Sequence, residues 1–265
     1  MHARTNPPDT PRAGWRIINV ITLVVLLAAN GAAGSGAMSG ESIGVIANRY
    51  RSDFLPADYV FAIWSVIYLA LTAFTIYQAL PGAGAREAER RVGGWWLVSS
   101  ALNIAWVTAF SFSHFGTAML VMAALLVTLV VIAVRVQPIA DGTSAAGRWC
   151  VAYPFAIYLA WISVAIIANT FQYAHVVGWG GFGIAESTWA VVMMAVATVL
   201  GLAMVSTRGL WLFPIVVAWA LWGIGARFAG EPALHLPAQL LAALGLTGGA
   251  AAWRWRRHVR TTGAA

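Results

Sequence analysis

Long apolar stretches alternate with short polar breaks along most of this chain. Eight stretches each approach the ~20 residues that a helix needs to cross the hydrocarbon core of a bilayer. They cover residues 16–37, 56–80, 93–112, 115–135, 149–171, 188–206, 210–228 and 234–253. The breaks are charged, glycine-rich or contain proline, as in GAGAREAERR (82–91) and AGEP (229–232). The pattern therefore predicts an all-α fold, a polytopic membrane helix bundle with eight spans.

The composition agrees with a membrane protein. Hydrophobic residues make up 60% of the chain and charged residues only 9%, and the mean hydropathy is +0.76. These values exclude an ordinary soluble domain, in which about a quarter of the residues are charged. No acidic residue lies in the middle of an apolar stretch, which argues against an ion-coupled pump because such pumps carry ionisable groups inside the membrane.

The basic residues predict how the chain is oriented. All sixteen are Arg, and thirteen of them fall on one side of the membrane when the N-terminus is placed inside. The positive-inside rule then predicts that both termini are cytoplasmic. This orientation accounts for the net charge of +7, so we expect the lipid bilayer, and not nucleic acid, as the partner of the basic residues.

The first stretch has two interpretations. Residues 1–37 combine a basic start, an apolar core and the small residues GAAGSGA (31–37), a pattern that also occurs in cleaved signal peptides. Cleavage would leave seven spans with the same orientation. The sequence leaves a first span and a cleaved signal open.

Three of the predicted spans carry aromatic and polar residues on one face. In YPFAIYLAWISVAIIAN (153–169) the helical spacing aligns Tyr158, Trp161, Ala165 and Asn169, while the aliphatic residues between them are expected to contact lipid. The second span aligns Trp64 with Tyr68, and the third aligns Asn103 with Trp106. Polar groups within a bilayer face protein or a cavity, because they are costly when left unsatisfied in hydrocarbon.

These stripes have two interpretations. In the first, the polar side chains bond across helix contacts and the Trp side chains fill space between helices. In the second, the three stripes line an apolar, aromatic pocket with a few fixed polar groups, which is how small-molecule sites are built. Trp and Tyr rings would then stack on a flat, conjugated ligand.

The same three segments resemble the TspO/MBR family, the tryptophan-rich sensory proteins and peripheral-type benzodiazepine receptors. PADYVFAIWSVIY (56–68) is similar to the family's second-helix motif through Pro56, Trp64, Ser65 and Tyr68. LNIAWVTAF (102–110) is similar to the third-helix motif through Leu102, Asn103, Trp106 and Phe110. YLAWISVAIIAN (158–169) is similar to the fifth-helix motif through Tyr158, Leu159, Trp161, Ala165 and Asn169.

The resemblance implies a domain organisation. Residues 1–15 would be a cytoplasmic N-terminal tail, and residues 16–173 a TspO-like five-helix transmembrane bundle. Residues 174–265 would add three transmembrane helices and a basic C-terminal tail. The resemblance further implies a multi-pass protein of the bacterial inner membrane, and it leaves a homodimer open.

The resemblance also implies a function. The protein would bind a flat apolar ligand, such as the tetrapyrroles protoporphyrin IX or haem, and act as a sensor or regulator. The implied ligand-binding residues are Trp64, Tyr68, Asn103, Trp106, Tyr158, Trp161, Ala165 and Asn169, with Trp64 and Trp161 stacking on the ligand, Asn103 and Tyr68 orienting it, and residues 38–55 as a lid. Two alternatives are a light-dependent porphyrin-degrading enzyme and a membrane carrier of small amphipathic molecules.

The chain departs from the family pattern at several positions. Phe61 and Ala62 replace a Gly-Pro pair in the second-helix motif, and Val107 and Thr108 replace a Ser-Pro pair in the third. The sterol motif that follows the family's fifth helix is missing, because Tyr173 has no basic residue near it on its C-terminal side. The sequence contains no metal-ligand constellation and no recognisable catalytic triad, so the catalytic residues, if any, are not identified.

Overall fold

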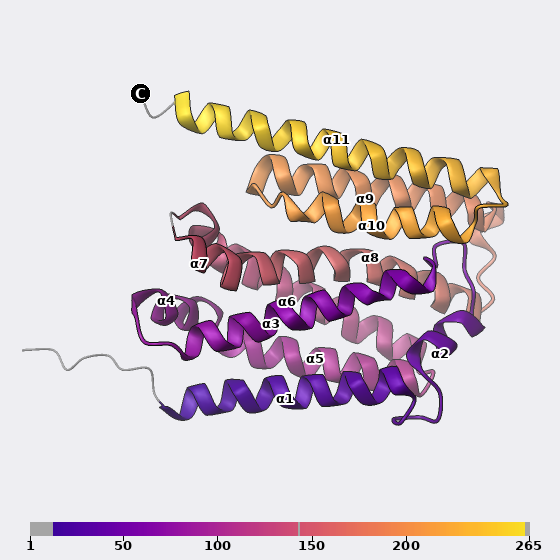
Figure 1. Cartoon of the computed structure of the whole chain (residues 1–265). Coiled ribbons are helices and arrows are strands. Elements are labelled where there is room, and N and C mark those ends of the chain that lie inside the picture. The colour runs from indigo at the N-terminus through magenta and orange to yellow at the C-terminus, as the bar shows by residue number, and fades with distance from the viewer. Residues whose placement is uncertain (1–12, 143, 263–265) are drawn as a thin grey trace, which may run out of the picture.

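The computed structural model describes residues 13–142 and 144–262, and within these ranges the chain is helical with no β-strand. The long helices run side by side and form a single elongated bundle (Figure 1). They are α1 (Ala13–Ser35), α3 (Ile63–Ala79), α5 (Gly94–Ser111), α6 (Phe115–Asp141), α8 (Tyr153–Val176), α9 (Glu186–Arg208), α10 (Leu212–Arg227) and α11 (Pro232–Thr262). Short elements join them: α2 (Ile43–Arg49), η1 (Asp58–Ala62), α4 (Ala83–Val92), α7 (Ala145–Gly147), η2 (Arg148–Ala152) and η3 (Gly181–Gly183).

The helices confirm an all-α, polytopic membrane protein. One long helix overlaps each of the eight predicted stretches. Six helical segments in the described part of the chain are long and apolar enough to cross a membrane, and they contain α1, α3, α6, α8, α9 and α11. Helix α10 is apolar but has only 16 residues, and the 18-residue α5 carries Trp, Ser and Asn, which lower its hydropathy. The beginning of α1 and the end of α11 lie at the same end of the bundle (Figure 1).

Helix α8 lies at the centre of the bundle, and this corrects an expectation. It packs against α3 and α6 on one side and α10 on the other. In an 18-residue apolar stretch of this span 78% of the residues are buried, against 22–33% in the corresponding stretches of the other five candidate spans. Leu159, Ile162 and Val164 were expected to contact lipid, yet all three are buried. Val164 lies in the wall of the cavity described below, and α10 packs along α8, where a five-helix bundle would leave lipid.

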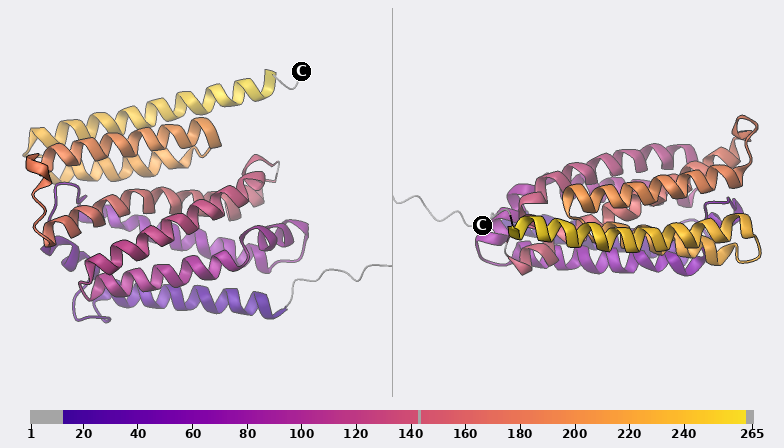
Figure 2. Two further views of the ribbon diagram at one scale, coloured as in Figure 1. Left: turned by 180° about the vertical axis from the view of Figure 1, so that it is seen from behind. Right: turned by 90° about the horizontal axis from the view of Figure 1, so that it is seen from above.

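The last three helices form a layer of their own. Helices α9, α10 and α11 pack on one another, and α10 joins this layer to α8. Figure 2 shows the three together on one side of the remaining helices. Small residues permit the close packing, as in other membrane helix pairs: a Cβ built on Gly201 would lie 3.3 Å from Pro214 Cα.

Helix α1 is built into the bundle. It packs on α5 and α3, and Trp96 of α5 donates from Nε1 to the Asn19 carbonyl oxygen at 3.4 Å. Asn30 of α1 donates from Nδ2 to Asn103 Oδ1 at 2.8 Å. These contacts favour a first span over a cleaved signal.

Three stretches outside the predicted spans are helical. The charged segment at 82–91 forms α4, which buries Ala85, Ala88 and Val92 against the bundle and leaves Arg86 and Arg90 exposed. Helix α6 continues through Pro138 to Asp141, past the end of the predicted span at residue 135. Helix α11 likewise runs past residue 253, so the basic aromatic segment RWRRH (254–258) is helical.

Candidate functional site

A cavity of about 650 Å³ lies at the end of the bundle that carries α2, away from the helix ends at which the described chain begins and finishes. Its walls come from α2, the segment around η1, and helices α3, α5 and α8. The lining residues are Ser42, Ile43, Gly44, Val45, Ala47, Asn48, Arg49, Leu55, Pro56, Asp58, Phe61, Trp64, Trp106, Phe110, Trp161, Val164, Ala165, Ala168, Asn169 and Gln172.

The inner wall of this cavity is an array of aromatic rings centred on Trp64. The Trp64 ring stacks on Trp106 at a centroid distance of 5.5 Å and on Tyr68 at 5.6 Å. It also meets Trp161 and Tyr158 edge to face, each at 6.1 Å. These are the separations at which aromatic pairs attract one another. The predicted stripes of the second, third and fifth motifs therefore meet in space and hold one another in place.

The structure divides the eight predicted site residues into two groups. Trp64, Trp106, Trp161, Ala165 and Asn169 line the cavity. Tyr68, Asn103 and Tyr158 are not among its lining residues. They lie behind the ring of Trp64 and connect it to the rest of the bundle.

Asn103 shows why the second group does not reach the cavity. It is completely buried. Its Nδ2 donates to Tyr158 Oη at 2.8 Å, and its Oδ1 accepts from Asn30 Nδ2 at 2.8 Å. The amide thus joins α1, α5 and α8, and the ligand-orienting role expected of Asn103 and Tyr68 stays a prediction.

Some of the polar atoms in the cavity wall already have hydrogen-bond partners within the protein. Asn169 donates from Nδ2 to the Ala165 carbonyl oxygen at 3.0 Å and accepts from Trp106 Nε1 at 3.5 Å. Asn169 therefore orients the Trp106 ring. Trp161 Nε1 is buried and has no hydrogen-bond partner among the residues that the structure describes.

Phe61 takes part in the wall at the position where the family motif has glycine. It lines the cavity, and its ring meets Trp161 edge to face at 6.2 Å. The departure from the family motif therefore adds an aromatic side chain to the wall.

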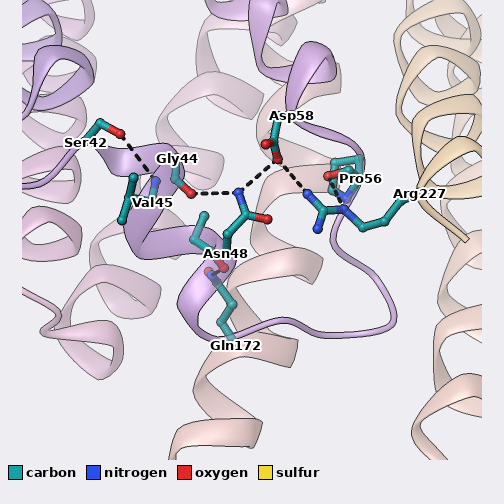
Figure 3. Close-up of polar contacts among 9 residues, drawn as sticks. Ser42, Gly44, Val45, Asn48, Pro56, Asp58, Gln172 and Arg227 are labelled. Carbon is teal, nitrogen blue, oxygen red and sulfur yellow. Dashed lines mark hydrogen bonds and ion pairs between the residues drawn. The ribbon is translucent and has the colours of Figure 1, made fainter.

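The mouth of the cavity is polar and is formed by α2 and η1. Ser42 caps α2 by accepting from the Val45 amide at 3.4 Å. Asn48 Nδ2 donates to Asp58 Oδ1 at 2.9 Å, and Gln172 of α8 donates from Nε2 to the Ala47 carbonyl oxygen at 3.1 Å. Figure 3 shows these contacts together with Arg227 of α10. The segment expected to act as a lid, residues 38–55, thus supplies α2 to the outer wall.

Comparison with known proteins agrees with this geometry. A family model described as TSPO-like protein matches residues 16–251. The chain belongs to the TSPO-like protein family. No curated protein and no solved structure matches the chain significantly. The match confirms the resemblance drawn from the three motifs.

The match also extends the resemblance along the chain. The motifs of the TSPO-like chain end at Asn169, but the matched region continues through α9 and α10 and into α11. The last three helices are therefore part of what makes this chain similar to its family.

Sequence reasoning did not find the residues that form the mouth of the TSPO-like cavity. Asp58, Gln172 and Arg227 lie near the ends of predicted spans, and Asn48 lies in the segment between two of them; polar side chains are ordinary in both places. A signal was present in Arg227, since it is one of only three Arg on the side of the membrane expected to be outside.

A second hollow of about 810 Å³ lies between the end of α8 and the start of α9, and it contains none of the eight predicted residues. Its lining is mostly apolar and includes Trp179 and Trp189, whose rings lie 5.9 Å apart. Within the described residues, no group of three His, Cys, Asp or Glu could hold a metal ion. The cavity around Trp64 is the better candidate because three independent motifs meet there.

Proposed function

We propose that this TSPO-like protein binds a flat, largely apolar ligand such as a porphyrin in the cavity at Trp64, and acts as a membrane sensor or regulator. The observation that carries the proposal is the aromatic array, in which Trp64, Trp106 and Trp161 all line one cavity. A volume of about 650 Å³ falls within the ~300–1,000 Å³ of small-molecule sites.

The distribution of polarity supports an amphipathic ligand. The inner wall is built from indole and phenyl rings, which attract the faces and edges of a conjugated ring system. The mouth carries Asn48, Arg49 and Asp58, and Arg49 is ion-paired with Glu41. A porphyrin would place its ring among the Trp side chains and its carboxylates near the Arg49 guanidinium at the mouth.

The test is a titration of the purified protein in detergent with protoporphyrin IX, followed by the porphyrin absorption band and by Trp fluorescence. We expect saturable binding. Trp64→Phe and Trp161→Phe should each weaken it by about two- to tenfold, since aromatic contacts contribute roughly 0.5–1.5 kcal/mol.

Trp222→Phe is the matched control. Trp222 is 54% exposed on α10 and does not line the cavity, so this variant should bind like the unmodified protein. Absorption changes that rise linearly with porphyrin concentration, or that are the same in all four proteins, would refute binding in this cavity.

A further inference from the structure

The segment that forms one side of the mouth, residues 56–60, is fastened to α10. The Ala57 amide donates to the Gly223 carbonyl oxygen at 3.0 Å. Trp219 Nε1 donates to the Val60 carbonyl oxygen at 3.1 Å. Arg227 Nε donates to the Pro56 carbonyl oxygen at 3.0 Å, and its Nη2 donates to Asp58 Oδ1 at 2.6 Å. Four hydrogen bonds therefore connect the last three helices to the entrance of the cavity.

The two segments approach each other closely. A Cβ built on Gly223 would lie 2.0 Å from Val60 Cγ2, so only glycine permits the observed contact between α10 and η1. Small residues allow membrane helices to pack at such short range. The glycine at this position of α10 thus allows the close approach of η1, which lies at the start of the predicted span 56–80.

Asp58 carries this connection across the mouth to α2. Its Oδ1 accepts from Arg227 Nη2 at 2.6 Å and from Asn48 Nδ2 at 2.9 Å (Figure 3). Pro56, Asp58 and Asn48 line the cavity, whereas Arg227 does not. The Arg227 side chain is only 9% exposed, while that of Asp58 is 72% exposed. The guanidinium is therefore the fixed member of the pair and the carboxylate the member that it orients.

Helix α2 depends on such contacts. It has seven residues, and isolated helices shorter than ~12 residues are marginal in water. Its side-chain links to neighbouring elements include the bond from Asn48 to Asp58 and the bond from Gln172 to the Ala47 carbonyl oxygen. Hydrogen bonds to charged groups are stronger than neutral ones, so the relay through Asp58 is a substantial part of what holds α2.

We propose that Arg227 is a positioning residue for the cavity: it orients Asp58, which holds Asn48 and so keeps α2 over the mouth. The last three helices thereby set how readily the cavity opens. As far as it concerns ligand entry, this inference rests on the proposed function. The positioning of α2 itself does not require a ligand.

The first test is hydrogen–deuterium exchange of the ligand-free protein. In Arg227→Gln we expect the amides of residues 43–49 to exchange about tenfold faster, because a charge-assisted bond in the relay is lost. Arg227→Lys keeps a cation beside Asp58 and should restore part of the protection. Gln137→Ala is the matched control. It removes the bond from Gln137 Nε2 to the Arg208 carbonyl oxygen, which also joins α6 to α9 but lies at the opposite end of the bundle.

Two exchange results would overturn the inference. One is unchanged exchange of residues 43–49 in Arg227→Gln. The other is faster exchange in all helices alike, since that would assign Arg227 to general stability and not to the mouth.

The second test uses protoporphyrin IX as the probe in stopped-flow mixing. A mouth that opens more readily should raise the association and dissociation rate constants by a similar factor of about tenfold, with little change in Kd. Unchanged rate constants, or a change in only one of them and hence in Kd, would contradict the inference. If the unmodified protein does not bind the probe, the proposed function fails, and the exchange of residues 43–49 still decides the role of Arg227.

Discussion

Replacement of Asn103 by leucine separates a packing residue from a ligand-binding one. The family resemblance implies that Asn103 contacts the ligand, whereas the structure places it behind the cavity in a chain of hydrogen bonds. Asn103→Leu is close to isosteric and removes both interhelical bonds, the one to Tyr158 Oη at 2.8 Å and the one from Asn30 Nδ2 at 2.8 Å. Asn30 keeps its bond to the Leu26 carbonyl oxygen, but the Tyr158 hydroxyl loses its recorded partner.

The expected loss of stability follows from these two bonds. Interhelical hydrogen bonds in membrane proteins contribute ~0.6 kcal/mol on average and up to ~1.7 kcal/mol. Asn103→Leu should therefore lower the free energy of unfolding by about 1–3 kcal/mol. Tyr158→Phe removes one of the bonds and should cost about 1 kcal/mol. The double variant should cost less than the sum of the two, because neither partner is then left unsatisfied.

The assay is equilibrium unfolding in mixed detergent micelles, together with protoporphyrin IX titration of each variant. Stability should fall while the dissociation constant stays within about threefold, which corresponds to ~0.7 kcal/mol. A variant of normal stability whose affinity falls tenfold or more would refute this reasoning. Asn103 would then contact the ligand, as the resemblance implies.

Two further changes test other parts of the structure. Gly223→Ala should lower the midpoint of thermal unfolding, since the new Cβ would lie 2.0 Å from Val60 Cγ2, and overpacking costs about 1–3 kcal/mol. Gly245→Ala, whose nearest contact would be 3.7 Å, should not. Burial, reinforced by Glu186 and Glu231, raises the pKa of Asp53, so its charge opposes folding once the pH exceeds the ordinary value of 3.8. Asp53→Asn should therefore raise the unfolding midpoint at neutral pH, and this gain should shrink toward about pH 4.

The helices were predictable because the membrane imposes a simple requirement on them. A span must be apolar over about 20 residues, and each of the eight stretches met this condition closely enough to locate a helix. Local chemistry governs where helices end, and there the prediction was incomplete. The segment at 82–91 separates two spans, as its charge predicted, but alanines and a valine spaced along one face also let it fold as a helix against α3 and α6.

The inner wall of the cavity was predictable for a related reason. Trp64, Trp106 and Trp161 lie on separate helices, but each shares a helical face with polar residues that lipid would not accommodate. Hydropathy and periodicity thus indicated that the three faces turn inward. They did not indicate which residues of an inward face reach the cavity and which lie behind it. Asn103 and Trp106 lie on one face of one helix, three residues apart, and only Trp106 reaches the cavity.

The mouth was not predictable because it depends on contacts between residues far apart in the sequence. Asp58 and Arg227 are 169 residues apart, and nothing in the pattern of either segment pairs them. Their contact requires α10 to lie against η1, which in turn requires that the last three helices pack on α8 and not elsewhere on the bundle. The same packing puts protein against α8 beyond its aromatic stripe, where the sequence predicted lipid. One arrangement of α10 therefore accounts both for the buried central helix and for the link from Arg227 to α2. A change that displaced α10 would therefore expose α8 and, at the same time, release the link from Arg227 to α2.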